Sequence, residues 1–235
     1  MPENARSFKC SIYEQLARIG KAVSSPKRLE LLDLLCQGER TVEVLAKEAA
    51  LSIATTSHHL QILRAARLVG AEKEGLYVTY RLAGQNVSEF VLTLRGLAEN
   101  RLAEISEITR RFLANREGME PVRRETLLDR VRRGAVSVLD VRPVEEYRAG
   151  HLPGAISVPL KELERRLAEI PKHRPVVAYC RGPYCVLAIR AVELLRQHGY
   201  RATRLEDGIP DWRGHGLPVE TGEESTEVRR ARRLQ

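Results

Sequence analysis

The sequence predicts a multi-domain chain, with a mainly α winged helix-turn-helix module followed by an α/β module built on a parallel sheet. Its 235 residues are too many for one small module and fit two domains of roughly 100 to 130 residues each. Apolar residues make up 43% of the chain and charged residues 30%, a balance that supports packed cores and is untypical of disordered chains. Helical spacing of apolar residues dominates the first half, whereas strands and helices alternate in the second.

Composition also narrows the class of protein. No apolar run approaches the roughly 18 residues of a membrane span, and the opening MPENARSFKC lacks the apolar region of a signal peptide. We therefore expect a cytoplasmic protein without a membrane partner. The net charge of 39 − 31 = +8 suits a polyanion such as DNA, but residues 1–117 carry 17 − 14 = +3 and the rest 22 − 17 = +5. Charge alone therefore does not locate a DNA-binding face.

The first module begins with four predicted helices. Residues 12–22 form an amphipathic pattern, and a second helix covers Lys27 to Gln37, after Pro26 and before Gly38. Thr41 caps the third helix, and Ser52 caps a fourth that reaches about residue 66.

The fourth helix has one buried and one exposed side by its spacing. Thr56, Leu60, Leu63 and Arg67 fall on one side, which we expect to face inward. The polar residues that point outward or lie on the flank are Thr55, Ser57, His58 and Gln61. Two alternating segments, 69–73 and 77–82, follow and are joined at Glu74-Gly75, which predicts a β-hairpin. This order of helices and hairpin is typical of a winged helix-turn-helix.

A long helical pattern then runs from Val87 to about Asn115. Its apolar residues recur every three or four positions over ~40 Å at 1.5 Å per residue, which is too long to bury on a domain of about 100 residues. We interpret this stripe as a dimerisation helix, so we expect a homodimer. The alternative is a helix that packs within the chain under the second domain. Residues 115–121 (NREGMEP) break the pattern and predict a linker.

The second module alternates between strands and helices, which predicts a parallel sheet. The expected elements are a helix at 123–133, strands at 135–141 and 156–158, a helix at 160–170, a strand at 176–179, a helix at 186–199 and a strand at 203–205. The predicted domains are therefore residues 1–117 and 118–220. Residues 221–235 form a basic tail that we expect to be disordered.

The stretch from Ser25 to Leu82, with SHHLQILRAARLV followed by EGLYVTYRL, resembles the ArsR family of bacterial winged-helix repressors. The resemblance covers about residues 12–110 and implies binding of double-stranded operator DNA through a recognition helix in the major groove. The expected base-reading residues are Thr55, Ser57, His58 and Gln61, and a glutamine can pair with adenine through two hydrogen bonds. On the wing, Lys73 and Arg81 are expected to contact phosphates.

The resemblance to this family also suggests that the protein could sense a metal. However, the sequence lacks the ligands of the metal sites that members of the family use. Arsenite-binding members carry a cysteine pair where this chain has residues 41–45 (TVEVL), and all six histidines lie outside 87–115. We therefore expect no metal and no cofactor. Cys10 and Cys36 are either a thiol pair or small apolar packing residues. Four cysteines in a cytosolic chain indicate thiol chemistry or packing rather than a disulfide framework.

The second module carries a different chemical pattern, VVAYCRGPYC over residues 176–185. An apolar strand ends at Cys180, a short loop follows, and a helix begins near Cys185. Such a loop directs backbone N–H groups and a helix N-terminus at the sulfur, and these surroundings lower a thiol pKa and stabilise a thiolate or persulfide. Arg181 adds a positive charge. The anion-cradling residues of the loop are Gly182, Pro183 and Tyr184.

Three separated segments around this loop resemble the rhodanese domain, over about residues 121–220. They are DVR at 140–142, Tyr147 followed by HLPGA at 151–155, and LEDGIPDW at 205–212. The resemblance implies that Cys180 takes a sulfane sulfur from thiosulfate or a persulfide and passes it to a thiol acceptor. It also implies that Asp140 and Arg142 are structural supports, Arg142 through a pair with Glu146, and that His151 caps local structure.

This chain departs from the family pattern at two positions. Sulfurtransferases often place a cation five positions after the cysteine, where this chain has Cys185, and phosphatase relatives need an arginine where this chain has Val186. Phosphatase chemistry is therefore not expected. We interpret Cys185 as a resolving thiol that forms a disulfide or bridged polysulfide with Cys180; the alternative is a packing residue at the helix start.

The two resemblances together are similar to known ArsR–rhodanese fusions. They favour a homodimeric transcriptional regulator whose second domain senses or processes reactive sulfur at Cys180, with Arg181 and Cys185 as the other reactive-site residues. A change of ~1 to 3 kcal/mol in DNA affinity suffices for such a switch. One alternative is a rhodanese-type sulfurtransferase that the DNA-binding domain merely localises. The other is a metalloid-responsive repressor in which arsenite bridges Cys180 and Cys185, or Cys10 and Cys36.

Overall fold

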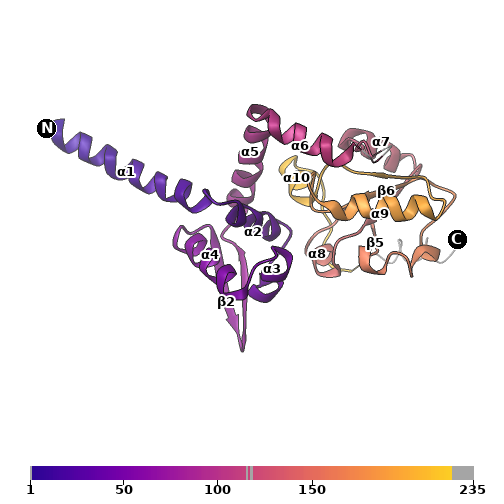
Figure 1. Ribbon diagram of the computed structural model, residues 1–235, viewed down its shortest axis with the longest axis horizontal. Helices are drawn as coiled ribbons and strands as arrows, with labels where there is room; N and C mark the ends of the chain where they lie inside the picture. Colours follow the sequence, from indigo (N-terminus) through magenta and orange to yellow (C-terminus); the bar gives the residue numbers. More distant parts are fainter. Residues whose placement is uncertain (1, 115, 117–118, 224–235) are drawn as a thin grey trace. The chain divides into compact units, whose positions relative to one another are not determined.

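A computed structural model describes residues 2–114, 116 and 119–223 of the chain, and these residues form two compact units. The first unit ends at Thr93 and the second begins at Leu94. Figure 1 shows the elements of each unit. The boundary lies inside the helix that covers Gln85–Arg101. Residues 94–114 therefore group with the second unit, whereas the sequence predicts the domain boundary at residue 117.

The first unit begins with four helices, as the sequence predicts. They are α1 (Pro2–Val23), α2 (Pro26–Cys36), α3 (Val42–Glu48) and α4 (Ile53–Ala65). Thr41 and Ser52 cap α3 and α4 by accepting hydrogen bonds from the N–H groups of Val44 and Thr55 at 3.5 and 3.1 Å. The first helix begins well before the predicted residue 12.

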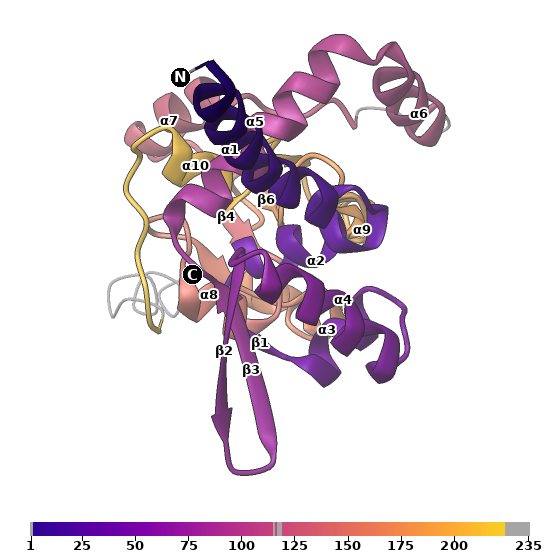
Figure 2. The same ribbon diagram turned by 90° about the vertical axis from the view of Figure 1, so that its left-hand side faces the viewer.

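A small antiparallel sheet completes the winged part of this unit. Its strands are β1 (Arg40–Thr41), β3 (Tyr77–Leu82) and β2 (Val69–Glu74), in that order across the sheet. The predicted hairpin is confirmed, and Figure 2 shows that it projects away from α3 and α4. The apolar residues with no exposed area in the core of this unit are Leu31, Leu32, Leu45, Ala49, Leu60 and Leu63.

The predicted single helix over 87–115 is wrong, because the chain forms two helices there. Helix α5 (Gln85–Arg101) and helix α6 (Ala103–Leu113) are separated by one residue, Leu102. The backbone of Leu102 is extended, with φ −113° and ψ 96°. Leu113 packs against the core of the second unit, and Arg116 forms a 2.9 Å ion pair with Glu193. These tertiary contacts, which apolar periodicity does not encode, hold α6 in place and favour the reading of α6 as a helix that packs within the chain.

The second unit is an α/β fold with a parallel sheet, as predicted. The strands β5 (Ile156–Ser157), β4 (Ser137–Asp140), β6 (Val176–Tyr179) and β7 (Ala202–Arg204) lie in that order and are all parallel. The helices are α7 (Arg124–Arg132), α8 (Val144–Ala149), α9 (Val186–Gln197) and α10 (Ile209–Gly214). Sequence reasoning did not predict α8 or α10, which are only six residues long.

The predicted helix at 160–170 is also wrong. The segment forms two short 3₁₀ turns, η1 (Leu160–Glu162) and η2 (Leu167–Glu169). Its apolar residues come in pairs three positions apart, Leu160 with Leu163 and Leu167 with Ile170. In a 3₁₀ turn, residues three apart lie on the same side, so this spacing fits the turns that form.

The central strand β6 alternates between two cores, which places the loop that follows it. Val176, Ala178 and Cys180 belong to the core with α9, whereas Val177 and Tyr179 belong to the core with α7, α8 and α10. Cys180 therefore follows the carboxyl end of a central parallel strand, where α/β proteins hold their reactive groups. No helix among the described residues is long and apolar enough to cross a membrane. Of the predicted basic tail, residues 224–235 lie outside the described part.

Candidate functional site

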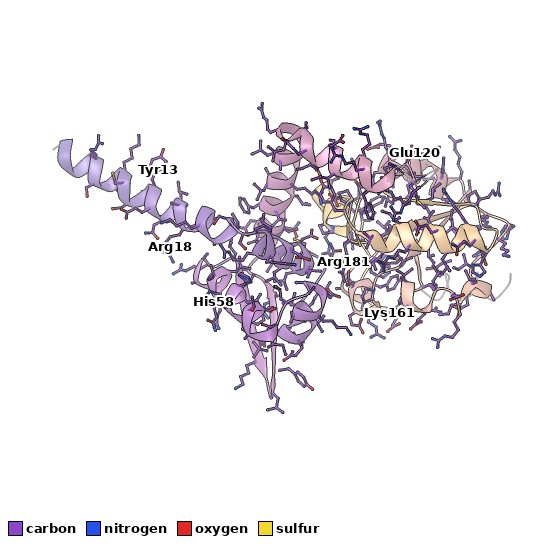
Figure 3. The ribbon with its side chains drawn as sticks, in the orientation of Figure 1. Tyr13, Arg18, His58, Glu120, Lys161 and Arg181 are labelled. Atoms are coloured by element: carbon purple, nitrogen blue, oxygen red, sulfur yellow. The ribbon has the colours of Figure 1, made fainter. Side chains whose placement is uncertain are left out.

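The outer face of α4 carries the predicted base-reading residues. Thr55, His58 and Gln61 are exposed and Ser57 is half-buried, whereas Thr56 on the other face is fully buried. Figure 3 shows the side chain of His58 on the outer side of the helix. The hydroxyl groups of Thr55 and Ser52 share a 2.8 Å hydrogen bond, so Thr55 has to exchange this partner to reach a base.

The wing carries the two predicted phosphate-contacting residues. Lys73 on β2 and Arg81 on β3 are exposed, and Arg81 forms a 2.6 Å ion pair with Glu72 on the neighbouring strand. Sequence reasoning missed Arg64, which is exposed one turn after Gln61 on α4 and adds a positive charge near the same face. Its position at i+3 from Gln61 is the signal that marks it.

The two cysteines of the second unit face each other across the loop. Cys180 is only 3% exposed, and its thiol donates a 3.4 Å hydrogen bond to the carbonyl oxygen of Cys185. The Cys180 thiol also hydrogen-bonds to the Cys185 side chain. Cys185 is the N-cap residue of α9, so its sulfur lies at the positive end of a helix. The structure thus brings together the two predicted reactive thiols.

The protonation of this pair differs from the expectation. Burial raises the pKa of the Cys180 thiol well above its ordinary range, whereas the hydrogen bond from Cys180 lowers the pKa of Cys185 to about 7. Backbone N–H groups of Arg181 and Leu187 and the charge of Arg181 lower the pKa of Cys185 further. The expected lowering of the Cys180 pKa is therefore not found, and the loop favours a thiolate on Cys185 instead.

Arg181 is held by a buried carboxylate. Its guanidinium donates to both oxygens of Glu146, with the shortest contact at 2.5 Å, and the Glu146 side chain has no exposed area. Figure 3 labels Arg181 in the second unit. This pair anchors the loop to α8 and leaves less of the Arg181 charge for a ligand.

A second buried network supports the strand ends. Asp140 accepts a 2.6 Å hydrogen bond from the guanidinium of Arg142 and a 2.5 Å bond from the hydroxyl of Tyr179. The Asp140 and Arg142 side chains are completely buried, which fits structural supports.

His151 stacks on Tyr147 with ring centroids 3.6 Å apart, and its Nδ1 lies 2.8 Å from the Tyr147 carbonyl oxygen. Among the described residues, no three His, Cys, Asp or Glu side chains are placed to hold a metal ion together.

The thiol loop is also tied to residues that sequence reasoning did not single out. A Cβ on Gly208 would overlap the carbonyl of Arg181, so the loop packs directly on the chain before α10. Asp211 accepts a 3.0 Å hydrogen bond from the N–H of Gly208 and an ion pair from Arg95 of α5. Tyr184 donates a 2.5 Å hydrogen bond to Glu99 of α5. The spacing of Arg95 and Glu99 at i and i+4 is their only sequence signal.

Two cavities lie beside the loop within the second unit. The larger has a volume of about 500 Å³ and is lined by residues of α5 and α6 together with Tyr184, Arg204 and Asp211. The smaller, about 200 Å³, is mainly apolar and lies between α6 and the start of α9. Arg204, which lines both, is 5% exposed and was not a sequence candidate, because a lone arginine in a short strand pattern carries no chemical signature.

Comparisons with known proteins agree with both units. A family model of the bacterial regulatory protein arsR family matches residues 25–70, and one of the rhodanese-like domain matches residues 124–215. The chain is 44% identical over 214 residues to the HTH-type transcriptional regulator Rv0324 of Mycobacterium tuberculosis, covering 91% of this chain and 94% of that relative. It is also 39% identical over 85 residues to a sulfurtransferase of Allochromatium vinosum, covering 36% of this chain and 78% of that protein.

A solved structure is similar to part of the chain. It is the winged helix-turn-helix DNA-binding domain Mb0332 of Mycobacterium bovis, described as homodimeric, with 39% identity and a TM-score of 0.39, covering 40% of this chain and 87% of that chain. A winged helix-turn-helix unit joined to a parallel-sheet unit with a thiol loop defines a two-domain DNA-binding regulator. The chain belongs to the ArsR family of bacterial transcriptional regulators and carries a rhodanese-like domain.

Proposed function

We propose that this regulator senses reactive sulfur through Cys180 and Cys185 and that loading of Cys180 changes its affinity for operator DNA. The observation that carries the proposal is the geometry of the pair: the buried Cys180 thiol lies 3.4 Å from the carbonyl oxygen of Cys185, and Cys185 caps the N-terminus of α9. The lowered pKa of Cys185, about 7, supports it. At pH 7 such a pair holds on average about half a proton fewer than two ordinary thiols, which favours nucleophilic sulfur chemistry.

The chemistry assigns a different role to each cysteine. Cys180 attacks the sulfane sulfur of a donor while its thiol proton passes to the Cys185 thiolate, so that a Cys180 persulfide forms and the rest of the donor leaves with the bonding electron pair. Cys185 can then attack the inner sulfur of this persulfide, which gives a Cys180–Cys185 disulfide and releases hydrosulfide. Both products remove the thiol proton of Cys180 and with it the hydrogen bond that now links the two residues.

Loading of the loop has a direct route to α5. The hydroxyl of Tyr184 donates to Glu99, and Arg95 pairs with Asp211, which also holds the N–H of Gly208. Burial next to the Glu99 carboxylate raises the pKa of Tyr184, so its hydroxyl keeps the proton that it donates. Helix α5 continues into the DNA-binding unit. A shift of the loop therefore acts on a helix that runs from the second unit into the DNA-binding unit.

The DNA-binding half of the proposal rests on α4 and the wing. Thr55, Ser57, His58 and Gln61 read base edges in the major groove, and Lys73 and Arg81 contact phosphates.

We further infer a homodimer, because α1 leaves an apolar stripe uncovered. Phe8, Ile12 and Leu16 recur every four residues and are 70, 47 and 59% exposed, and Figure 3 shows the neighbouring Tyr13 projecting from the same helix. A second copy of the chain is the partner that a self-complementary stripe of this kind fits.

The test is fluorescence anisotropy with DNA from upstream of the gene at fixed salt. Reduced protein, polysulfide-treated protein and treated Cys180→Ser protein are compared, with the persulfide measured by mass spectrometry in each sample. Treatment is expected to change the affinity at least about tenfold, equivalent to ~1.4 kcal/mol, and Cys180→Ser to abolish the change. If the persulfide forms and the affinity of the unchanged protein stays constant, the sensing role is refuted.

Two variants test the route through α5 without touching a cysteine. Tyr184→Phe removes the hydroxyl that reaches Glu99, so it is expected to load normally but to show a smaller affinity change. Tyr77→Phe, an exposed tyrosine on the wing, is the matched control. An unaltered affinity change in Tyr184→Phe contradicts this route.

The second candidate function is a rhodanese-type sulfurtransferase localised by the DNA-binding unit, which the similarity of this domain to sulfurtransferases favours. It predicts repeated turnover of donor and thiol acceptor, whereas a sensor needs to load only once per signal. The metalloid-responsive alternative predicts the loss of two free thiols on titration with arsenite. Cys10 is exposed and Cys36 buried, so Cys180 and Cys185 form the better site for it.

A further inference from the structure

We infer that the 200 Å³ cavity beside the thiol loop binds a monoanionic sulfur donor with an apolar body, and that Arg204 pairs with the anionic end. This inference rests on the proposed loading of Cys180 and adds the class of donor. An organic thiosulfonate, R–SO₂–S⁻, has this chemistry.

The walls of the cavity match an apolar body. Helix α6 contributes Ile108, Phe112 and Leu113, and the loop with the start of α9 contributes Pro183, Val186 and Ile189. Arg204 is the one charged side chain among the described residues that line it. A small apolar cavity with a single cation favours a ligand that has one charge and a hydrocarbon surface.

The guanidinium of Arg204 is held in place but forms few direct contacts, although the charge of Glu206 also acts on it. Its Nε donates a 2.9 Å hydrogen bond to the carbonyl of Met119, which fixes the guanidinium. Its two terminal nitrogens form no hydrogen bond or ion pair within the described part of the chain. The other arginines near the loop are engaged, Arg181 by Glu146 and Arg95 by Asp211.

The position of Arg204 places it near the reacting sulfur. Arg204 on β7 is the register partner of Ala178 on β6, and Cys180 follows two residues later on the same face of the sheet. Strand geometry puts the Cα atoms of Arg204 and Cys180 about 8 Å apart. Burial lowers the pKa of Arg204. A guanidinium stays charged at neutral pH despite such a decrease.

The transfer balances without another reactant. Cys180 attacks the terminal sulfur of the thiosulfonate as its proton passes to Cys185, an S–S bond to Cys180 forms, and the bond between this sulfur and the sulfonyl group breaks. The sulfinate R–SO₂⁻ leaves with the electron pair, so the sulfonyl sulfur is reduced and the Cys180 sulfur is oxidised. Cys180 is 3% exposed and does not line the cavity, so binding at Arg204 precedes an opening of the 181–186 loop.

The choice of a monoanion follows from the cost of burying charge. Thiosulfate carries two charges and no apolar body, and one guanidinium in an apolar cavity leaves the second charge without a partner. The full chain should therefore load Cys180 from benzenethiosulfonate at least about tenfold faster than from thiosulfate at equal concentration.

The experiment measures Cys180 persulfide formation by mass spectrometry with benzenethiosulfonate, and binding of the unreactive benzenesulfonate by calorimetry. Arg204→Gln should weaken binding at least about tenfold and slow loading similarly, while Arg204→Lys should recover part of both. Arg190→Gln, which removes an exposed arginine of α9, should change neither. Phe112→Ala should weaken binding of benzenesulfonate several-fold by removing part of the apolar wall.

The outcomes separate this inference from the proposed function. If the unchanged chain forms no persulfide with any donor, the proposed function fails. If it loads, but thiosulfate matches benzenethiosulfonate and Arg204→Gln behaves as Arg190→Gln does, only the cavity assignment is overturned. Thermal denaturation of each variant shows whether a loss of binding or loading is caused by unfolding. If Arg204→Gln is unfolded, the binding of benzenesulfonate to Phe112→Ala and Arg204→Lys decides whether the cavity assignment holds.

Discussion

The hydrogen bond from Cys180 to Cys185 predicts how the substitution Cys180→Ala changes the pKa of Cys185. This bond is the largest influence that lowers the pKa of Cys185 from an ordinary value near 9 to about 7. Alanine removes the donor but keeps the N–H groups of Arg181 and Leu187 and the charge of Arg181. The pKa of Cys185 should therefore rise by about one or more and remain below its ordinary value.

The expected size of this pKa change decides whether the rate or the pH dependence of Cys185 alkylation is the better quantity to measure. A rise in the pKa from 7 to 8 lowers the thiolate fraction at pH 7 from about one half to about one eleventh, but a more basic thiolate is intrinsically about threefold more nucleophilic. The net change in alkylation rate at pH 7 is then only about twofold. The pH at which the alkylation rate of Cys185 is half its maximum moves by the full pKa change, and it is the better readout.

The assay follows iodoacetamide labelling of the Cys185 peptide by mass spectrometry between about pH 5.5 and 9.5, a span of roughly four units around the expected midpoints. The exposed Cys10 in the same digest is the internal reference. We expect a midpoint of about 7 in the unchanged chain and a higher one in Cys180→Ala. An ordinary midpoint in the unchanged chain, or the same midpoint in both proteins, refutes the reasoning.

Three further predictions concern the supports of the loop and the DNA interface. Asp140→Asn leaves the guanidinium of Arg142 buried without its counterion and should lower the free energy of unfolding by about 3 to 5 kcal/mol in urea. Asp129→Asn, which loses an exposed pair with Arg133, should cost less than about 1 kcal/mol, and equal losses would contradict the argument. Gly208→Ala places a Cβ against the Arg181 carbonyl, so it should cost about 1 to 3 kcal/mol and slow Cys180 loading; unchanged loading would show that this contact does not shape the loop. Gln61→Ala should weaken operator binding by about 1 to 3 kcal/mol, while Lys73→Ala should weaken all DNA alike and reduce the salt slope by about 1, and the reverse pattern would reject these roles.

Local patterns in the sequence determined most of the elements. The caps at Thr41 and Ser52, the hairpin at Glu74-Gly75 and the strand that ends at Tyr179 each depend on residues next to one another in the chain. The pairing of Cys180 with Cys185 was also predictable, because a loop of four residues holds the two cysteines close together. Both family resemblances rest on such contiguous stretches.

Tertiary structure decided what depends on burial and on distant partners. The helix that follows the break at Leu102 packs Leu113 against the core of the second unit, and Arg116 pairs with Glu193. Apolar periodicity alone does not report these contacts. The thiolate falls on Cys185 because burial disfavours charge on Cys180, an effect that no linear spacing reports.

The same reason explains the residues that sequence reasoning missed. Arg204, Asp211 and Glu99 have no motif, and they matter because the fold brings β7, α10 and α5 to one loop from positions far apart in the chain. The sequence by itself therefore determined the two kinds of domain and the placing of Cys180 and Cys185 at the two ends of one loop. Only the folded chain decided which cysteine carries the charge and which buried cation lies beside it, because both depend on desolvation and on contacts between distant segments.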